Sequence, residues 1–315
     1  MPDSGLPFLD GEGDYTSAQI AERTGVSLEQ AKKLWRALGF PEAGDAKMFT
    51  EEDVDALRRV NAVIESGLID FDLSVALTRA MGLTMARLSD WEISALLQHL
   101  ESRPEENGID AVSRMFSSEL SQNFEALMLY AWRRHLSASV TRVLASMAGD
   151  SDLHTTQLSV GFADIVSFTA LSNRISEDRI GDLVELFESR CADVVANQRG
   201  RVIKSLGDSV LFVNDDPIRA YDTAEGIINV IGRDHRMPDV RVGLASGAVV
   251  TRMGDVFGPP VNMAARLTAV ARRNRIIIDS ATAELLPEDQ FETRRLPARP
   301  VRGFGLVEPV AVRRV

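Results

Sequence analysis

Two aspartates, Asp164 and Asp208, follow apolar stretches that have the composition of buried strands. Asp164 comes after VGFA, and Asp208 lies at the tip of a tight turn within RVIKSLGDSVLFV. Carboxylate oxygens suit Mg²⁺ or Mn²⁺, whereas zinc sites usually contain His or Cys, and neither accompanies this pair. Either aspartate alone could be a turn or helix-cap residue. The two together favour a site for a pair of divalent cations.

The composition predicts a globular protein of about two domains. The chain has 315 residues, of which 45% are hydrophobic and 26% are charged. This apolar content is sufficient for cores and argues against intrinsic disorder. The net charge of −11 argues against a nucleic-acid partner held through its phosphates, although a local basic face would still be compatible with one.

Cysteine usage and the N-terminal residues favour a cytoplasmic protein. Cys191, the single cysteine, lies in a helical pattern and is interpreted as a small buried hydrophobic residue rather than a nucleophile. One cysteine forms no disulfide framework, which fits a reducing compartment. The acidic N-terminus has no signal-peptide pattern. The sequence contains no run of about 18 apolar residues, so no membrane helix is predicted.

Residues 1–123 are predicted to form an all-helical domain without a catalytic constellation of its own. Thr16 or Ser17 is expected to cap a first helix, and Thr50, which three acidic residues follow, to cap a later one. Residues 89–90 are expected to cap the last of these helices. Four apolar residues of this region are expected in its core: Met81, Met85, Trp91 and Leu96.

A short helix, a turn at Gly25 and a second helix resemble a helix-turn-helix of the MerR-like kind. Its basic residues Lys32, Lys33 and Arg36 could contact DNA phosphates. They could equally form the solvated face of an amphipathic helix. The core side of that helix would then consist of Ala31, Leu34, Trp35 and Leu38.

Residues 124–148 form a long run without Pro or Gly, in which apolar residues recur at spacings of three and four. This spacing predicts one long helix, which ends at the polar segment beginning with Gly149. The segment 124–151 is therefore interpreted as a linker that transmits a signal between domains. A dimerising or packing helix is an equally good interpretation.

From Leu158 onward the pattern changes to alternating strands and helices that include hairpins. Two strands are expected around Gly247. Because hairpins are present, the sheet should be mixed rather than wholly parallel. The predicted fold class is α+β, with a ferredoxin-like βαββαβ core in a domain covering residues 152–315.

Four motifs in this region occur in a specific order. They are FADIVSFT at 162–169, KSLGD at 204–208, RVGLASG at 241–247 and DVFGPPVNMAARL at 255–267. In this order they resemble the catalytic domain of class III adenylyl cyclases. The resemblance covers residues 152–315, about half of the chain.

The resemblance implies conversion of ATP to 3′,5′-cyclic AMP and pyrophosphate. Asp164 and Asp208 match the residues that hold two Mg²⁺ or Mn²⁺ ions, and the Ile165 carbonyl matches a further metal ligand. One ion would activate the ribose 3′-hydroxyl and the other would hold the triphosphate.

Lys204 and Asp255 match the pair that reads the purine. Adenine presents an acceptor at N1 and a donor amine at N6, so one donor and one acceptor side chain can recognise it. Guanine reverses this pattern, which favours ATP over GTP. Arg302 matches a position that contacts the terminal phosphates, where the family usually has Lys. Arg241 matches a position that is structural in some members and faces phosphate in others.

Asn262 and Arg266 lie four residues apart, on one face of the predicted helix. They match the residues that orient the ribose and meet the charge developing on the α-phosphate. In the family the metal-binding aspartates come from one protomer, and Asn and Arg come from the other. Since all these positions are filled here, the resemblance implies a head-to-tail homodimer with two equivalent sites.

The order of domains, with LYAWRRHL at 129–136, resembles mycobacterial-type two-domain cyclases that respond to pH. We expect residues 1–123 to restrain the catalytic dimer, with His135 and His154 as candidate titrating groups. A small-molecule or lipid ligand of the N-terminal domain is a further candidate partner. Two other functions stay open: a DNA-binding regulator with a nucleotide-sensing cyclase-like domain, and a module that binds nucleotide without turnover.

Overall fold

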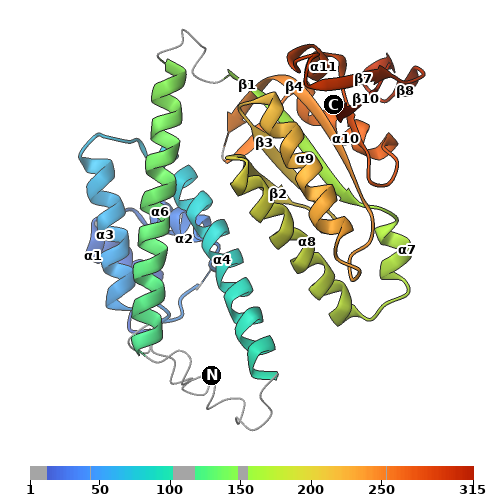
Figure 1. Cartoon of the computed structure of the whole chain (residues 1–315). Helices are drawn as coiled ribbons and strands as arrows, with labels where there is room; N and C mark the ends of the chain where they lie inside the picture. The colour runs from blue at the N-terminus through green and yellow to red at the C-terminus, as the bar shows by residue number, and fades with distance from the viewer. Residues whose placement is uncertain (1–12, 43, 102–117, 148–154, 253) are drawn as a thin grey trace. The chain divides into compact units, whose positions relative to one another are not determined.

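The computed structural model describes residues 13–42, 44–101, 118–147, 155–252 and 254–315 (Figure 1). The chain divides into two compact units, Met1–Ala138 and Ser139–Val315. The boundary between them falls within helix α6, which spans Ser118–Met147. The three-part division predicted from the sequence, with boundaries near residues 123 and 151, stays a prediction.

The N-terminal unit is helical where it is described. Thr16 caps its first helix and Thr50 caps its third, each through a capping box that also uses a side chain three residues later. Both predicted helix starts are therefore confirmed. Besides α6, the helices of this unit are α1 (Ser17–Thr24), α2 (Leu28–Ala37), α3 (Glu51–Glu65) and α4 (Phe71–Glu101).

Helix α4 is longer and more exposed than the sequence pattern predicted. It continues without a break through residues 89–90, where the Ser94 hydroxyl donates to the Asp90 carbonyl (2.7 Å), so the predicted helix start there is wrong. Three of its expected core side chains are also exposed in the described chain. The exposed fractions are 52% for Met81, 42% for Met85 and 60% for Trp91.

In the helix-turn-helix region, two of the three basic residues form ion pairs with acidic residues of the same chain. Lys33 forms an ion pair with Asp72 (3.1 Å), and Arg36 forms one with Glu42 (3.1 Å). Ala31 is buried on the opposite side of α2. These contacts support the solvated face of an amphipathic helix over a surface for DNA phosphates.

The C-terminal unit has the predicted ferredoxin-like core, and the fold class is confirmed. Strands β2, β3, β1 and β4 lie side by side in that order, all antiparallel (Figure 1). β6 then adds parallel to β4 and leads to β10 and β7. The core elements are β1 (Thr155–Ile165), α7 (Phe168–Ser172), α8 (Glu177–Asn197), β2 (Arg201–Ser205), β3 (Ser209–Asn214), α9 (Pro217–Gly232) and β4 (Val240–Arg252).

The remaining elements extend the core. They are β5 (Asp255–Phe257), α10 (Pro259–Val270), β6 (Ile276–Ile278), α11 (Ser280–Leu285), β7 (Phe291–Arg295), β8 (Arg299–Val301), β9 (Gly305–Val307) and β10 (Val310–Arg314). β4 runs through Gly247 as one strand, so the two strands expected around this glycine are in fact one. The glycine adopts a φ of 156° there, which side-chain residues rarely do.

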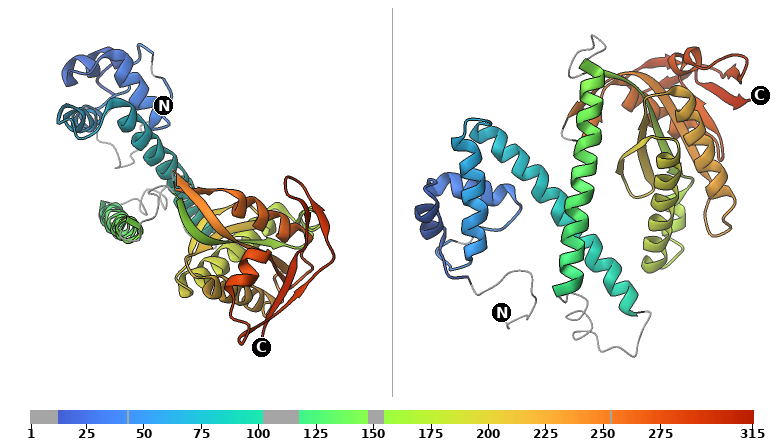
Figure 2. Two further views of the ribbon diagram at one scale, coloured as in Figure 1. Left: turned by 90° about the horizontal axis from the view of Figure 1, so that it is seen from above. Right: turned by 60° about the vertical axis from the view of Figure 1, so that its left-hand side comes forward.

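The two faces of the sheet are covered by different helices. α8 and α9 cover one face (Figure 2). Phe187, Cys191 and Phe212 are buried beneath them. Burial raises the pKa of the Cys191 thiol, which agrees with a packing role. α10 packs on the other face, where its Leu267 is buried in one cluster with Val160 of β1 and Val249 of β4. Side chains alternate along β1, so Asp164 shares the α10 face with Val160.

Helix α10 approaches the sheet very closely at Gly243. A Cβ atom added there would lie 2.4 Å from the Thr268 nitrogen and 2.5 Å from the Ala264 carbonyl oxygen. The Thr268 hydroxyl also lies within hydrogen-bond distance of the Phe162 carbonyl on β1 (3.2 Å). The backbone of α10 is thus held against β1 and β4.

We therefore expect Gly243→Ala to lower the free energy of unfolding by about 1–3 kcal/mol, because the backbone of α10 must move. The matched control is Gly181→Ala in α8, where an added Cβ meets no atom within 4 Å. Gly181→Ala should raise the free energy of unfolding by about 0.5–1 kcal/mol, because alanine has a higher helix propensity than glycine. Urea denaturation of both variants measures the difference, and equal midpoints would contradict the close approach.

Candidate active site

The structure brings Asp164 and Asp208 to the same end of β1. The Ile165 amide donates to the Asp208 carbonyl oxygen (2.9 Å), and Asp164 lies opposite Ser209 in the β1–β3 register. Burial and the negative charge of Asp164 raise the pKa of Asp208, while the charge of Arg241 acts in the opposite direction. The two carboxylates are therefore close enough to interact electrostatically.

Both carboxylate oxygens of Asp164 are hydrogen-bonded. The Ser209 hydroxyl donates to Oδ1 (2.6 Å), and the Arg241 guanidinium reaches Oδ2 from Nε (2.7 Å) and from Nη2 (2.6 Å). Ser209 and Arg241 face Asp164 from the two neighbouring strands, β3 and β4. The sequence analysis did not single out Ser209. Its signal appears only once the register is known, because cross-strand neighbours interact.

The donor atoms fit Mg²⁺ or Mn²⁺. Burial raises the pKa of Asp208 most, and the negative charge of Asp164 raises it further, so a divalent cation between the two carboxylates would relieve their repulsion. The Ile165 carbonyl follows Asp164 directly and is a third oxygen donor in the sequence. Within the described ranges, no group of three or more His, Cys, Asp or Glu side chains forms a metal site.

Lys204 and Asp255 also lie together, although 51 residues separate them in the chain. The Lys204 ammonium donates to Asp255 Oδ2 at 2.5 Å, which joins β2 to the start of β5. Asp255 Oδ1 accepts from the Val256 amide (2.8 Å). The exposed fractions of the two side chains are 37% and 27%, so a ligand could reach both. The predicted donor–acceptor pair thus exists within one chain.

Asn262 and Arg266 lie on the exposed side of α10, whose opposite side is buried at Ala264 and Leu267. Arg302 follows β8 and is exposed in the turn before β9. None of the three polar side chains has a hydrogen bond or ion pair with another described residue. They are therefore available to groups outside their own chain.

Comparison with known proteins identifies the family. Residues 152–312 match the family described as adenylate and guanylate cyclase catalytic domain. The chain belongs to this family. The predicted resemblance to class III adenylyl cyclases is confirmed, and the two motifs that carry the aspartates lie within the matched residues.

Three relatives match this cyclase along nearly its whole length. An adenylate cyclase of Streptomyces coelicolor is 39% identical, over 96% of this chain and 86% of the relative. An adenylate cyclase of Glutamicibacter nicotianae is 34% identical, over 96% of this chain and 79% of the relative. A pH-sensitive adenylate cyclase of Mycobacterium tuberculosis is 31% identical, over 98% of this chain and 80% of the relative. The similarity therefore includes the helical N-terminal region.

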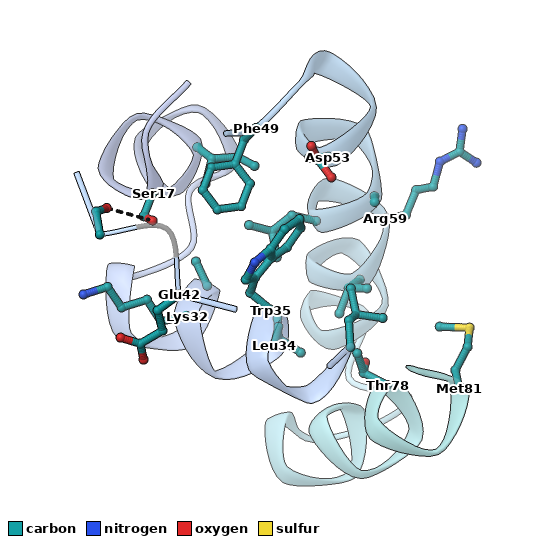
Figure 3. Close-up of a pocket in the computed structure, with 17 residues that line it drawn as sticks. Ser17, Lys32, Leu34, Trp35, Glu42, Phe49, Asp53, Arg59, Thr78 and Met81 are labelled. Carbon is teal, nitrogen blue, oxygen red and sulfur yellow. Dashed lines mark hydrogen bonds between the residues drawn. The ribbon is translucent and has the colours of Figure 1, made fainter. Parts of the chain in front are cut away.

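The N-terminal unit of the cyclase contains an apolar cavity of about 290 Å³, lined by residues from α1 to α4 and from the segment before α3 (Figure 3). Its inner wall includes Leu34, Trp35 and Phe49, and the rings of Trp35 and Phe49 meet edge to face with centroids 4.5 Å apart. The charged ends of Lys32 and Arg59 point away from the centre. The cavity can take a small apolar group.

Of the two histidines predicted to titrate, the structure describes only His135. His135 lies on α6 with an exposed side chain, and His154 lies outside the described residues. Among the described helices, none has an apolar stretch long enough to cross a bilayer.

The Lys204–Asp255 pair should contribute little to the stability of the cyclase. Because both side chains are partly exposed, we expect a coupling energy of about 0–1 kcal/mol between Lys204→Ala and Asp255→Ala. A double-mutant cycle in urea measures this energy. A coupling well above this range would contradict this expectation and would mean that the pair stabilises the contact between β2 and β5.

Proposed function

We propose that this chain converts ATP to 3′,5′-cyclic AMP and pyrophosphate, with Asp164, Asp208 and the Ile165 carbonyl holding two divalent cations. The observation that carries the proposal is the backbone hydrogen bond from Ile165 to Asp208, which ties the Asp208 turn to the end of β1 that bears Asp164. When bound, the cations supply positive charge to the attacking 3′-oxygen and to the triphosphate. The names of the relatives support ATP as the substrate.

Lys204 and Asp255 read the adenine ring. Their ion pair already places one donor and one acceptor side by side, so a purine edge can be recognised without a large rearrangement. Lys204 donates to the adenine N1 acceptor, and Asp255 accepts from the N6 amine. Guanine has a donor at N1 and an acceptor at O6, and would leave both protein groups mispaired.

Asn262 and Arg266 complete the site of a second copy of the chain. Both side chains are exposed on α10 and have no described partner in their own chain, which supports a role across a dimer interface. Asn262 orients the ribose, and Arg266 stabilises the charge that develops on the α-phosphate. Arg302 contacts the terminal phosphates. The resulting head-to-tail homodimer has two equivalent sites.

Residues 1–123 control the dimer through the segment 124–151. Two observations support this part of the proposal: α6 belongs to both units, and one relative is named a pH-sensitive adenylate cyclase. His135 and His154 are the titrating candidates on or near this segment. A small-molecule or lipid ligand would enter the apolar cavity beside Trp35. The protein acts in the cytoplasm.

The function is tested by incubating the full chain with ATP or GTP and Mn²⁺ and identifying the products by chromatography. The wild type should form cyclic AMP, with GTP turned over at least about tenfold more slowly. Asp208→Asn should reduce the rate by about a hundredfold or more, because a ligand of the cations is lost. Asp215→Asn, an exposed aspartate after β3, is the control. Wild-type activity in Asp208→Asn would rule out the proposed metal site.

The shared site is tested by mixing two inactive variants, Asp208→Asn and Arg266→Ala. Half of the dimers in an equal mixture contain one copy of each, and each such dimer keeps one intact site of two. The mixture should therefore recover about a quarter of wild-type activity. Recovery should depend on exchange of subunits, which co-purification of the two variants through different affinity tags can follow. No recovery despite confirmed exchange would place both residues in a site within one chain.

A further inference from the structure

A basic depression of about 490 Å³ lies where α9 ends, on the side of the sheet opposite to Asp164. It is formed by one residue of α8, the end of α9 and the connection to β4. Four of its six lining residues are arginine or histidine, in a chain whose net charge is −11. The lining residues are Arg190, Val230, Arg233, Asp234, His235 and Arg236.

Arg190 occupies a position on α8 that normally belongs to an apolar side chain. It lies between Phe187 and Val194 on the helix stripe that packs against the sheet, and both of these neighbours are buried. The Arg190 Nε atom is itself buried and has no hydrogen-bond partner among the described residues. A buried donor on a charged group is costly unless something accepts from it.

Asp234, the one carboxylate in the lining, does not fill this role. Arg236 donates to Asp234 Oδ1 from Nε (2.9 Å) and from its backbone amide (3.1 Å), and to Oδ2 from Nη2 (2.7 Å). These hydrogen bonds hold the pKa of Asp234 well below its ordinary value, and the charge of Arg190 adds to the effect. Asp234 therefore stays ionised and is occupied by Arg236. Arg190 and Arg233 have no hydrogen bond or ion pair within the described residues.

We propose that this depression binds the phosphate group of a small molecule or a free phosphate ion. A phosphate offers several acceptor oxygens, and guanidinium groups match its geometry with paired N–H donors. Arg190 would contact the anion at the floor through the terminal nitrogens of its half-buried guanidinium, and Arg233 would approach the anion from the exposed end of α9.

The site is separate from the candidate active site. α8 and α9 cover one face of the sheet, whereas Asp164 lies on the face that α10 covers. A ligand in the depression would therefore not compete directly for the aspartates. The proposal stands whether or not the chain turns over ATP.

The test is isothermal titration of the full chain with inorganic phosphate and with glycerol 3-phosphate, in EDTA and at constant ionic strength. The wild type should bind saturably. Arg190→Gln and Arg233→Gln should each weaken binding about tenfold or more, because a charge-assisted hydrogen bond is lost. Arg294→Gln on β7 removes an exposed arginine elsewhere and should bind as the wild type does.

Absence of saturable binding by the wild type up to about 10 mM phosphate would overturn the proposal. So would wild-type affinity in both depression variants. Arg233 is exposed, so Arg233→Gln keeps the test valid even if Arg190→Gln perturbs folding. Tighter binding of glycerol 3-phosphate would identify a phosphorylated small molecule as the ligand, and tighter binding of inorganic phosphate would identify the free ion. Either order supports the site.

Discussion

The antiparallel register of β1 between β3 and β4 is the constraint on which the candidate active site depends. It places Ser209 on one side of Asp164 and Arg241 on the other, and it ties the Asp208 turn to the end of β1 through the Ile165 amide. A shift by one residue would turn Asp164 toward α8 and α9, among the buried side chains of the other face. The close contact of α10 at Gly243 adds a second restraint, because the helix can sit there only if β1 and β4 keep their alignment.

Much of the C-terminal unit could be predicted from the sequence because its signals are local. Alternation along β1 indicates which side chains share a face, and the turn around Gly207 places Asp208 at its tip. The contact between Lys204 and Asp255 is different, since it joins β2 to a hairpin that starts from the far end of β4. The ordered motifs suggested this pair, but no spacing rule could have given its distance. The hydrogen bond from Ser209 to Asp164 also depends on strand pairing, which the sequence does not specify, and it was not predicted.

The errors in the N-terminal unit also have a physical cause. Helical periodicity marks Met81, Met85 and Trp91 as apolar positions suited to packing, but it does not predict that their own chain covers them. The predicted helix start at residues 89–90 failed because Ser and Asp, although favoured at N-caps, also occur in the interior of helices. A long helix tolerates them when its backbone hydrogen bonds continue, as they do through α4.

The ion pair between Arg241 and Asp164 has a consequence for folding in the absence of a bound cation. A pair of neighbouring carboxylates would normally oppose folding until a metal neutralised them. Here the chain provides its own positive charge, held on Asp164 by two nitrogens. The charge of Asp164 is therefore balanced within the chain, so the native state does not require a divalent cation to neutralise it. If the proposed cations bind, they would enter a site that is already folded.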